Sequence, residues 1–373
     1  MSFYNTLPIF QHLETLKMIE SGNGSHCPPL HARIEPTELC NFRCGFCCWY
    51  NEDRHKTIPS ARFTGRNIFR RQRILNLIDE LIEAGTMAFS FSGGGDPLLY
   101  PWMAILLKKI SDYRRPFGIT SNMAMNLNDD LFNQLAGAAW IRWSMNAGTY
   151  DTYLKIHNPI SVNGHNIFER VKHNIKQLID IRSKNNLPVN INASFIVSDL
   201  NKKDILSAAK LAKELGVACI SFRKDTPVHK QNVVNGYTDE EEHDIHAAKE
   251  QFETERFKVF INYDRLEDIQ KANDPELFCY YSNHSVYIAA DGSVYPCCYT
   301  RLNAKYAIGN VNHSDFKKIW ESQKRQENYK HLLFDQCPTC AYGQTIKALK
   351  PLYEGKNKAQ DVFIATNHPN YFI

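Results

Sequence analysis

Three cysteines near the start of the chain have the residue type and spacing for metal chemistry. Cys40, Cys44 and Cys47 follow the pattern C-x3-C-x2-C after a short apolar run. Thiolates this close in sequence can surround one metal centre, and a [4Fe–4S] cluster takes a cysteine thiolate on each iron that it holds tightly. Three such ligands leave one iron open. Zinc is the alternative, but it usually takes four ligands from paired C-x2-C clusters, and no second pair lies nearby. The trio therefore favours an iron–sulfur enzyme.

This spacing resembles the signature of the radical S-adenosylmethionine (SAM) superfamily. The resemblance implies that the open iron binds the amino and carboxylate groups of SAM. It also implies that a reductant such as flavodoxin or ferredoxin reduces the cluster, which cleaves SAM to methionine and a 5′-deoxyadenosyl radical. Family members often have an aromatic residue before the third cysteine, near the adenine, and Phe46 has that place. Cys48 is extra to the motif, and we expect a packed thiol there.

A glycine-rich turn follows the second apolar run. Gly94-Gly95-Asp96-Pro97 resembles the "GGEP" motif of the same superfamily, with Asp96 in place of glutamate. The resemblance implies that Gly94, Gly95 and Asp96 lie against the SAM amino group, since glycines let a ligand approach the backbone closely. A plain strand-to-helix turn is the alternative.

Apolar strand-like runs alternate with amphipathic helical segments over most of the chain. We expect strands at 30–35, 88–92, 117–122, 140–145, 189–197 and 218–223, and helices at 67–84, 106–110, 129–135, 166–185 and 203–215. This alternation predicts βαβ units and a parallel sheet, an α/β fold. It matches the partial (β/α)6 barrel that the resemblance implies. In such folds ligands bind beyond the C-terminal ends of the strands.

Further polar residues fall at those strand ends. The resemblance implies that Asn122 and Ser144 contact the SAM ribose or carboxylate, although capping of the next helix is the alternative. Arg223, at the end of the sixth strand, could pair with the SAM carboxylate or form a surface ion pair. His229 and Lys230 follow in the next loop, where solvated side chains are the simpler expectation.

A second group of cysteines lies in the last hundred residues. Two strand-like runs around Asp291-Gly292 predict a hairpin that brings Cys279 and Cys297 together, and Cys337 and Cys340 follow as a C-x2-C pair. Four thiolates can saturate another cluster or a structural zinc ion. The spacing Cys279-x12-Gly292-x4-Cys297 resembles the SPASM extension of radical SAM enzymes. Because no cysteine follows Cys340, it resembles the shortened twitch form, which implies one auxiliary [4Fe–4S] cluster.

Composition narrows the classes of partner. Hydrophobic residues make up 43% of the chain and charged residues 23%, and a net charge of +4 is too small to indicate nucleic acid or a membrane surface. No apolar run is long enough to cross a bilayer, and the N-terminus lacks the features of a signal peptide. Eleven cysteines without an export signal favour metal binding over disulfides, and hence a cytoplasmic protein.

These patterns predict five segments along the chain. In order, they are an N-terminal lead-in at 1–31, the partial barrel at 32–240, a connecting helical segment at 241–275, a small hairpin-plus-helix auxiliary domain at 276–345 and a tail at 346–373.

The resemblance implies that the deoxyadenosyl radical abstracts a hydrogen atom from the substrate, and we expect a small polar substrate such as a sugar, cyclitol or nucleotide-sugar. The result would be oxidation or epimerisation, with the auxiliary cluster in electron transfer. Only 39 residues precede Cys40, which we expect to be too few for a leader-peptide-binding domain. A peptide or protein maturase is the second hypothesis, and a non-catalytic iron–sulfur or zinc scaffold is a third. The substrate, the catalytic base and any hydrogen donor are not indicated.

Overall fold

The computed structural model describes residues 8–52, 63–160, 167–188, 190–225, 236–263, 278–330, 340, 342–366 and 372. Within them the strands form one ten-stranded sheet in the order β10-β9-β8-β1-β2-β3-β4-β5-β6-β7. The strands are β1 (His31–Ile34), β2 (Ala88–Phe91), β3 (Phe117–Ser121), β4 (Trp140–Ser144), β5 (Ile191–Val197), β6 (Cys219–Lys224), β7 (Lys258–Ile261), β8 (Ser285–Ile288), β9 (Ser293–Tyr295) and β10 (Gly309–Asn310).

Helices connect these strands and cover one face of the sheet. The α-helices are α1 (Leu13–Glu20), α3 (Arg71–Glu83), α4 (Met103–Asp112), α5 (Asp129–Ala136), α6 (Tyr150–His157), α7 (Ile167–Lys184), α8 (Ile205–Leu215), α9 (Asp239–Phe252), α11 (Phe316–Trp320), α12 (Gln323–Lys330), α13 (Gly343–Tyr353) and α14 (Ala359–Val362). Short 3₁₀ turns include η1 (Pro8–Gln11), η2 (Gly24–His26), η3 (Pro97–Leu99), η5 (Lys202–Asp204), η6 (Tyr280–Asn283), η7 (Thr300–Leu302) and η8 (Ala304–Tyr306). The predicted α/β class and parallel sheet are confirmed.

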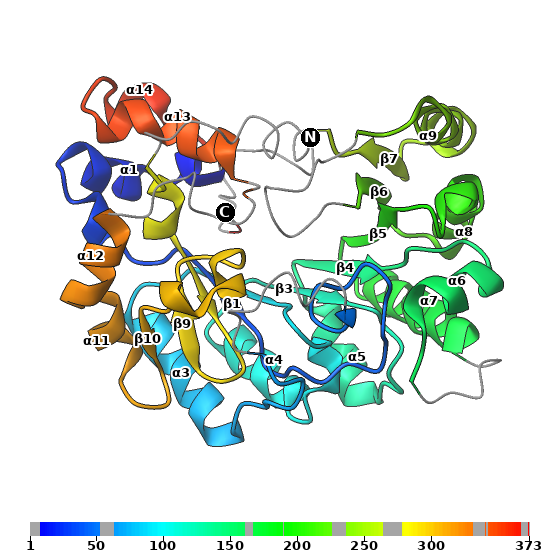
Figure 1. Cartoon of the computed structure of the whole chain (residues 1–373), viewed down its shortest axis with the longest axis horizontal. Helices are drawn as coiled ribbons and strands as arrows, with labels where there is room; N and C mark the ends of the chain where they lie inside the picture. Colours follow the sequence, from blue (N-terminus) through cyan, green and yellow to red (C-terminus); the bar gives the residue numbers. More distant parts are fainter. Residues whose placement is uncertain are drawn as a thin grey trace.

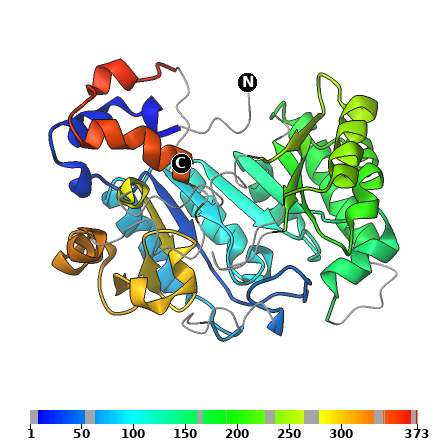
Figure 2. The same cartoon turned by 45° about the horizontal axis from the view of Figure 1, so that its top comes forward.

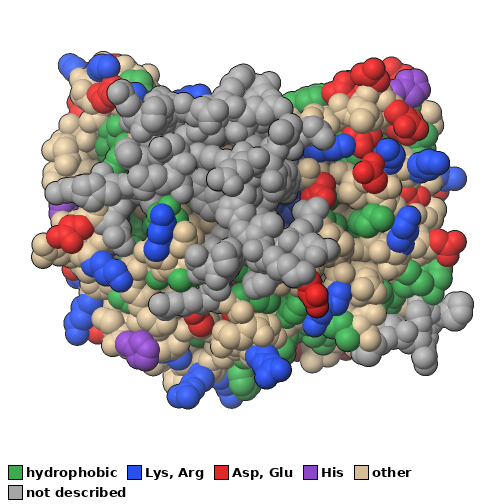
Figure 3. Space-filling view, viewed as in Figure 1, with side chains coloured by type: hydrophobic (Ala, Val, Ile, Leu, Met, Phe, Trp, Pro, Cys, Tyr) green, Lys and Arg blue, Asp and Glu red, His purple; other side chains and the backbone are tan. Residues whose placement is uncertain are grey.

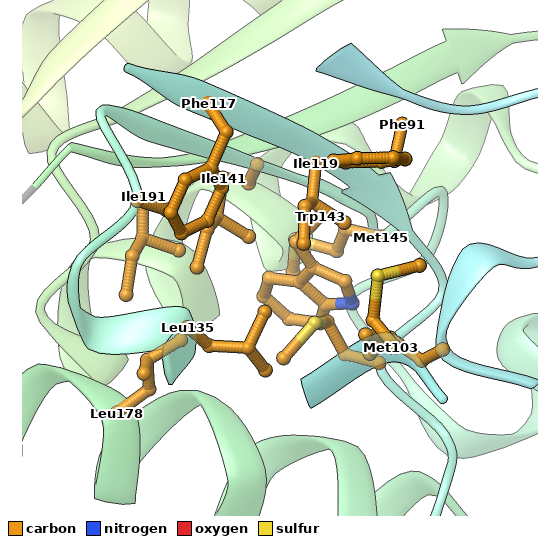
Figure 4. Packing of buried hydrophobic residues seen from close by; sticks show 14 of the residues in the cluster. Phe91, Met103, Phe117, Ile119, Leu135, Ile141, Trp143, Met145, Leu178 and Ile191 are labelled. Atoms are coloured by element: carbon orange, nitrogen blue, oxygen red, sulfur yellow. The ribbon is translucent and has the colours of Figure 1, made fainter. Parts of the chain in front are cut away.

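The sheet curves into an open half-barrel with the helices on its convex side (Figures 1 and 2). The alternation of side chains along each strand explains this arrangement, because successive residues face opposite sides of a sheet. Figure 4 shows Phe117, Ile141 and Ile191 pointing from their strands toward Leu135 and Leu178 on helices α5 and α7. The residues that alternate with these apolar side chains along each strand face the concave side.

The concave side is polar. Register pairing sets Thr120 of β3 beside Arg142 of β4, and Arg142 beside Asn192 of β5. One step nearer the strand ends, Ser144 pairs with Ser194, and Ser194 pairs with Ser221 of β6. The half-barrel is therefore packed with apolar side chains outside and lined with hydrogen-bonding groups inside.

The segment expected to be a helical connection at 241–275 is different. It begins within helix α9, but strand β7 follows and pairs in parallel with β6, from Cys219↔Lys258 to Phe222↔Ile261. The apolar run Val259-Phe260-Ile261 is short and follows a charged helix. Its hydrophobic periodicity alone therefore does not distinguish a strand from a continuing helix. The barrel thus has one more parallel strand than expected.

The start of α9 is acidic, with Asp239, Glu240, Glu241 and Glu242 in its first turn. Figure 3 shows carboxylates gathered over this end of the molecule. Thr238 caps the helix in a capping box with Glu241, whose buried carboxylate also forms an ion pair with Lys224 at 2.5 Å. This acidic run therefore includes one buried, paired member.

The predicted hairpin around Asp291-Gly292 is confirmed, and it belongs to the main sheet. Strand β8 pairs in parallel with β1, from His31↔Ser285 to Ile34↔Ile288, while β9 returns antiparallel to β8. Gly292 has φ +84°, and a Cβ there would lie 2.4 Å from Asn312 Nδ2. The turn therefore requires glycine.

A second apolar cluster lies beside the hairpin. It combines residues of the N-terminal segment, including Leu16 and Ile19 of α1, with Ile346 and Leu349 of α13 and with Cys279 and Cys297. Figures 1 and 2 show α1, α13 and α14 packed together at this end. In the described part of the chain, no helix is long and apolar enough to cross a membrane.

Candidate active site

The first cysteine loop leaves the C-terminal end of β1, as predicted. Cys40, Cys44 and Cys47 are half-buried there. Burial raises the pKa of the Cys40 thiol to about 12, with further contributions from Asp96 and Cys47. Burial also raises the pKa of Cys44 well above its usual value, and Cys47 and Cys40 add to the effect. The three thiols are therefore close enough to influence one another electrostatically.

A histidine that the sequence did not indicate lies against this loop. His157 Nδ1 is 3.2 Å from Cys44 Sγ, and its Nε2 is 3.0 Å from the carbonyl oxygen of Met145. Burial lowers the pKa of His157 to about 4, so the ring is neutral. Since Nε2 faces an acceptor, it carries the proton, and Nδ1 accepts from the thiol. Phe46 meets the same imidazole edge-on, with ring centroids 6.2 Å apart.

The glycine turn packs directly onto the backbone of the cysteine loop. The Asp96 N–H donates to the Leu39 carbonyl at 2.8 Å. A Cβ on Gly95 would lie 2.3 Å from that carbonyl oxygen, and a Cβ on Gly94 would lie 2.4 Å from the Phe63 ring. The absence of side chains here is thus required for loop packing, and the predicted contact of both glycines with SAM stays a prediction.

The Asp96 carboxylate is turned into the protein. It accepts hydrogen bonds from Ser121 Oγ at 2.9 Å, the Asn122 N–H at 2.7 Å and the Leu98 N–H at 3.0 Å. Burial raises its pKa, although these hydrogen bonds oppose the shift. Asn122 Nδ2 in turn donates to Asn41 Oδ1 in the cysteine loop at 2.8 Å. Asp96 and Asn122 therefore tie the ends of β2 and β3 to the cluster loop, and their contact with SAM remains a prediction.

The remaining predicted strand-end residues lie on the concave side. Ser144 ends β4 and pairs with Ser194, and Arg223 Nη2 donates to Ser194 Oγ at 3.0 Å. These residues are neighbours, as expected, but their contacts with SAM are not tested. His229 and Lys230 lie outside the described residues.

The second cysteine group sits beside the first on the same sheet. Cys279, Cys297 and Cys340 are buried in one apolar cluster, while Cys337 lies outside the described residues. Burial raises the pKa of Cys297 to about 12, with additional effects of Cys298 and Cys279. The Tyr342 N–H donates to Cys340 Sγ at 3.3 Å. The hairpin has brought Cys279 and Cys297 together, as predicted.

A buried arginine joins the two cysteine groups, and sequence patterns did not indicate it. Arg301 Nη2 is 3.3 Å from Glu38 Oε1, and Arg301 Nε is 3.5 Å from Glu35 Oε2. All three side chains are fully buried. Burial tends to raise the pKa of Glu38, but hydrogen bonds from Asn67 and Thr64 outweigh this and lower it.

A carboxylate just after a buried strand signals a buried cation when the following segment is itself enclosed, because such groups are rarely buried unpaired. Glu35 and Glu38 carry that signal, but nothing in the sequence selects their partner among 44 lysines and arginines.

Comparison with known families decides the classification. Residues 34–246 match the family model described as the radical SAM superfamily. The chain belongs to that superfamily. Residues 279–341 match the SPASM model, described as an iron–sulfur cluster-binding domain, which agrees with the predicted auxiliary domain.

Individual relatives of this radical SAM protein differ in chemistry. It is 28% identical over 172 residues to dTDP-4-amino-4,6-dideoxy-D-glucose ammonia-lyase of Streptomyces venezuelae, a match that covers 45% of this chain and 33% of that enzyme. It is 20% identical over 364 residues to the subtilosin biosynthesis protein AlbA of Bacillus subtilis, covering 91% of this chain and 74% of AlbA. The chain thus spans about a third of the first relative's length.

Solved structures confirm the fold. SuiB of Streptococcus suis bound to S-adenosylmethionine superposes with a TM-score of 0.58 at 15% identity, covering 91% of this chain and 76% of SuiB. SuiB bound to its precursor peptide SuiA gives a TM-score of 0.59 at the same identity, covering 90% and 76%.

The cofactors of this radical SAM enzyme are SAM and [4Fe–4S] clusters. The residues present fit them, because soft thiolates suit iron–sulfur clusters and both thiol groups lie in water-poor surroundings. Within the described ranges, no three His, Cys, Asp or Glu side chains are gathered around a single ion position. The thiolates of a cube-shaped cluster bind separate iron atoms and stand farther apart.

Proposed function

We propose that this enzyme abstracts a hydrogen atom from a small polar substrate, such as a sugar, cyclitol or nucleotide-sugar, and thereby oxidises or epimerises it. When bound, the reduced cluster with SAM supplies the 5′-deoxyadenosyl radical for that step. Cys40, Cys44 and Cys47 hold this cluster at the C-terminal ends of the strands. A flavodoxin or ferredoxin in the cytoplasm supplies the electron.

The observation that carries the substrate class is the polar concave face. Thr120 of β3, Asn192 and Ser194 of β5, and Ser221 of β6 present hydroxyl and amide groups from three strands of the concave face. Such groups orient a substrate that has several hydroxyls, since each buried substrate oxygen needs a hydrogen-bond partner. The nucleotide-sugar in the name of the Streptomyces venezuelae relative supports the same class.

The auxiliary cysteines support a redox outcome. Cys279, Cys297, Cys337 and Cys340 would fill the coordination of one cluster, which leaves no iron to bind substrate. The hairpin between Cys279 and Cys297 is hydrogen-bonded to β1, the strand that leads into the first cysteine loop. We therefore assign this group to electron transfer with the substrate radical.

A peptide maturase is the second candidate. The match to AlbA extends over 91% of this chain, far more than the match to the ammonia-lyase. SuiB, whose fold is similar, binds a precursor peptide.

Two measurements test the proposal. Anaerobically reconstituted protein should hold about eight irons per chain and form 5′-deoxyadenosine from SAM and dithionite. Cys44→Ala should lose this activity, whereas Cys48→Ala, which removes the neighbouring extra thiol, should retain it. If Cys44→Ala matches the wild type, the radical function is wrong.

The substrate class is tested by isotope transfer. Deuterated nucleotide-sugars, cyclitols and peptides are incubated with the enzyme, and 5′-deoxyadenosine is analysed by mass spectrometry. Deuterium from a sugar or cyclitol supports the proposal. Deuterium only from peptides favours the maturase.

A further inference from the structure

Two arginines face the interior of the half-barrel. Arg33 lies on β1 between Ala32 and Ile34, and Arg142 lies on β4 between Ile141 and Trp143. Those four apolar neighbours belong to the core on the convex side. Because side chains alternate along a strand, both guanidinium groups point to the concave side.

Neither guanidinium has a carboxylate partner in the described part of the chain. Arg142 lies over the Trp140 ring at 5.7 Å from its centroid. Arg33 Nη1 donates to Cys298 Sγ at 3.4 Å, and the same guanidinium lies 5.7 Å from the centroid of the Tyr342 ring. The contrast is Arg301, which is buried between two glutamates.

A half-buried guanidinium without a counter-ion is costly, because it gives up hydration without gaining an opposite charge. Aromatic rings offset only part of that loss. Two such groups on one concave surface therefore create a site of positive potential that favours an anion.

The position of this site separates it from the strand ends. Arg142 lies two residues before Ser144, and Arg33 lies seven residues before Cys40, so both are deeper in the barrel than the residues predicted to contact SAM. Strands β1 and β4 are three places apart in the sheet, roughly 14 Å along its curve at the usual strand spacing. The Phe372 ring lies between these strands, 5.4 Å from the His31 ring and 5.5 Å from the Trp140 ring, so a ligand that reaches both guanidinium groups must pass beside this ring or displace it.

We propose that Arg33 and Arg142 bind the diphosphate group of a phosphorylated substrate. This inference rests on the proposed function and specifies its substrate class. Guanidinium groups bind phosphate oxygens through paired N–H donors, and two arginines from different strands match a group with two charged phosphoryl units. A single carboxylate would occupy only one of them.

Calorimetric binding of inorganic pyrophosphate to the SAM-loaded, cluster-containing enzyme tests the proposal. Arg33→Gln and Arg142→Gln should each weaken binding about tenfold or more, equivalent to about 1.4 kcal/mol. The control Arg71→Gln, which removes an exposed arginine on α3, should bind as the wild type does. Acetate, which has a single carboxylate, should bind the wild type at least about tenfold more weakly than pyrophosphate. Iron content measured after titration excludes extraction of the cluster.

A second measurement does not depend on variant folding. Phenylglyoxal modifies accessible arginines, and pyrophosphate should protect the peptides that contain Arg33 and Arg142 in the wild-type enzyme, but not the peptide of Arg71. The inference would be overturned if the wild type did not bind pyrophosphate or bound acetate equally well. It would also be overturned if the two variants bound pyrophosphate as the wild type does, if pyrophosphate competed with SAM, or if it failed to protect the two peptides.

Formation of 5′-deoxyadenosine without substrate separates this inference from the proposed function. The control Arg71→Gln should form it at the wild-type rate. If the wild type forms none but binds pyrophosphate as expected, the proposed function fails and the anion site stands. If the activity is present and the variants bind pyrophosphate normally, only the anion site fails.

Discussion

Arg301 Nη2 lies 3.3 Å from Glu38 Oε1, and neither side chain is exposed to solvent. Glu38 is two residues before Cys40, and Arg301 is four residues after Cys297. One ion pair therefore connects the loop of the first cluster to the loop of the auxiliary group. The same guanidinium reaches Glu35, which also accepts from Tyr287 Oη at 2.7 Å, so the hairpin and β1 share one buried polar network.

Replacing the cation of this network should be strongly destabilising. Arg301→Met leaves Glu35 and Glu38 buried without their cation, and we expect a loss of about 3–5 kcal/mol in the free energy of unfolding. Urea unfolding measures it, and Arg301→Lys should recover part of the loss. Lys108→Met, which breaks the exposed ion pair with Asp112, should cost less than about 1 kcal/mol. Equal stability of Arg301→Met and wild type would contradict the assigned role.

Gly95→Ala should displace the first cysteine loop. The new Cβ would lie 2.3 Å from the Leu39 carbonyl oxygen and 2.5 Å from the Glu38 carbonyl carbon, and backbone atoms cannot rotate away. We expect reduced iron content and slower formation of 5′-deoxyadenosine. Gly236→Ala is the matched control, because nothing lies within 4 Å of its added Cβ. Normal iron content in Gly95→Ala would show that the loop tolerates the shift.

Adjacent cysteines in the hairpin give a paired test of ligand assignment. Cys297 is buried with Cys279, whereas Cys298 accepts from Arg33 and lies 3.7 Å from Tyr342 Oη. Cys297→Ala should lose about half of the iron, and Cys298→Ala should retain nearly all of it. Iron analysis and Mössbauer spectroscopy measure both. The reverse result would exchange the two assignments.

His284 should make the protein less stable in mild acid. Burial lowers its pKa to about 3, from an ordinary value of 6.5, with smaller effects of Arg325 and His12. Below pH 6.5 the unfolded chain binds the proton and the folded chain does not, so stability falls as pH falls through this window. Between pH 7.5 and 5.5 this histidine should contribute a loss of about 1.4 kcal/mol.

The control for this pH effect is His284→Asn, which removes the titrating group. Its unfolding free energy should fall less between the two pH values than that of the wild type. If the unfolding free energies of the two proteins changed equally with pH, the folded protein would protonate His284 as readily as the unfolded chain does.

Short-range patterns predicted much of this structure. The C-x3-C-x2-C run, the glycine turn and the alternation of strands with helices each depend on neighbouring residues, and so the parallel sheet and the loop of Cys40 were predictable. The Asp291-Gly292 turn predicted its hairpin for the same reason.

Pairings between distant segments were not predictable from one sequence. No local pattern tells that β8 adds to β1, that Arg301 is the partner of Glu38, or that His157 lies against Cys44. The role of Asp96 also depends on tertiary structure, because its hydrogen-bond donors come from the end of another strand.

The pairing of β8 with β1 has a consequence for biosynthesis. The ribosome completes His31–Ile34 long before Ser285–Ile288, so one edge of β1 stays uncovered while most of the chain is made. An uncovered strand edge can pair with another chain and aggregate, and contacts between distant segments form slowly. The first cysteine loop therefore follows an open strand edge during synthesis, and the pairing of β8 with β1 closes that edge only after most of the chain is made.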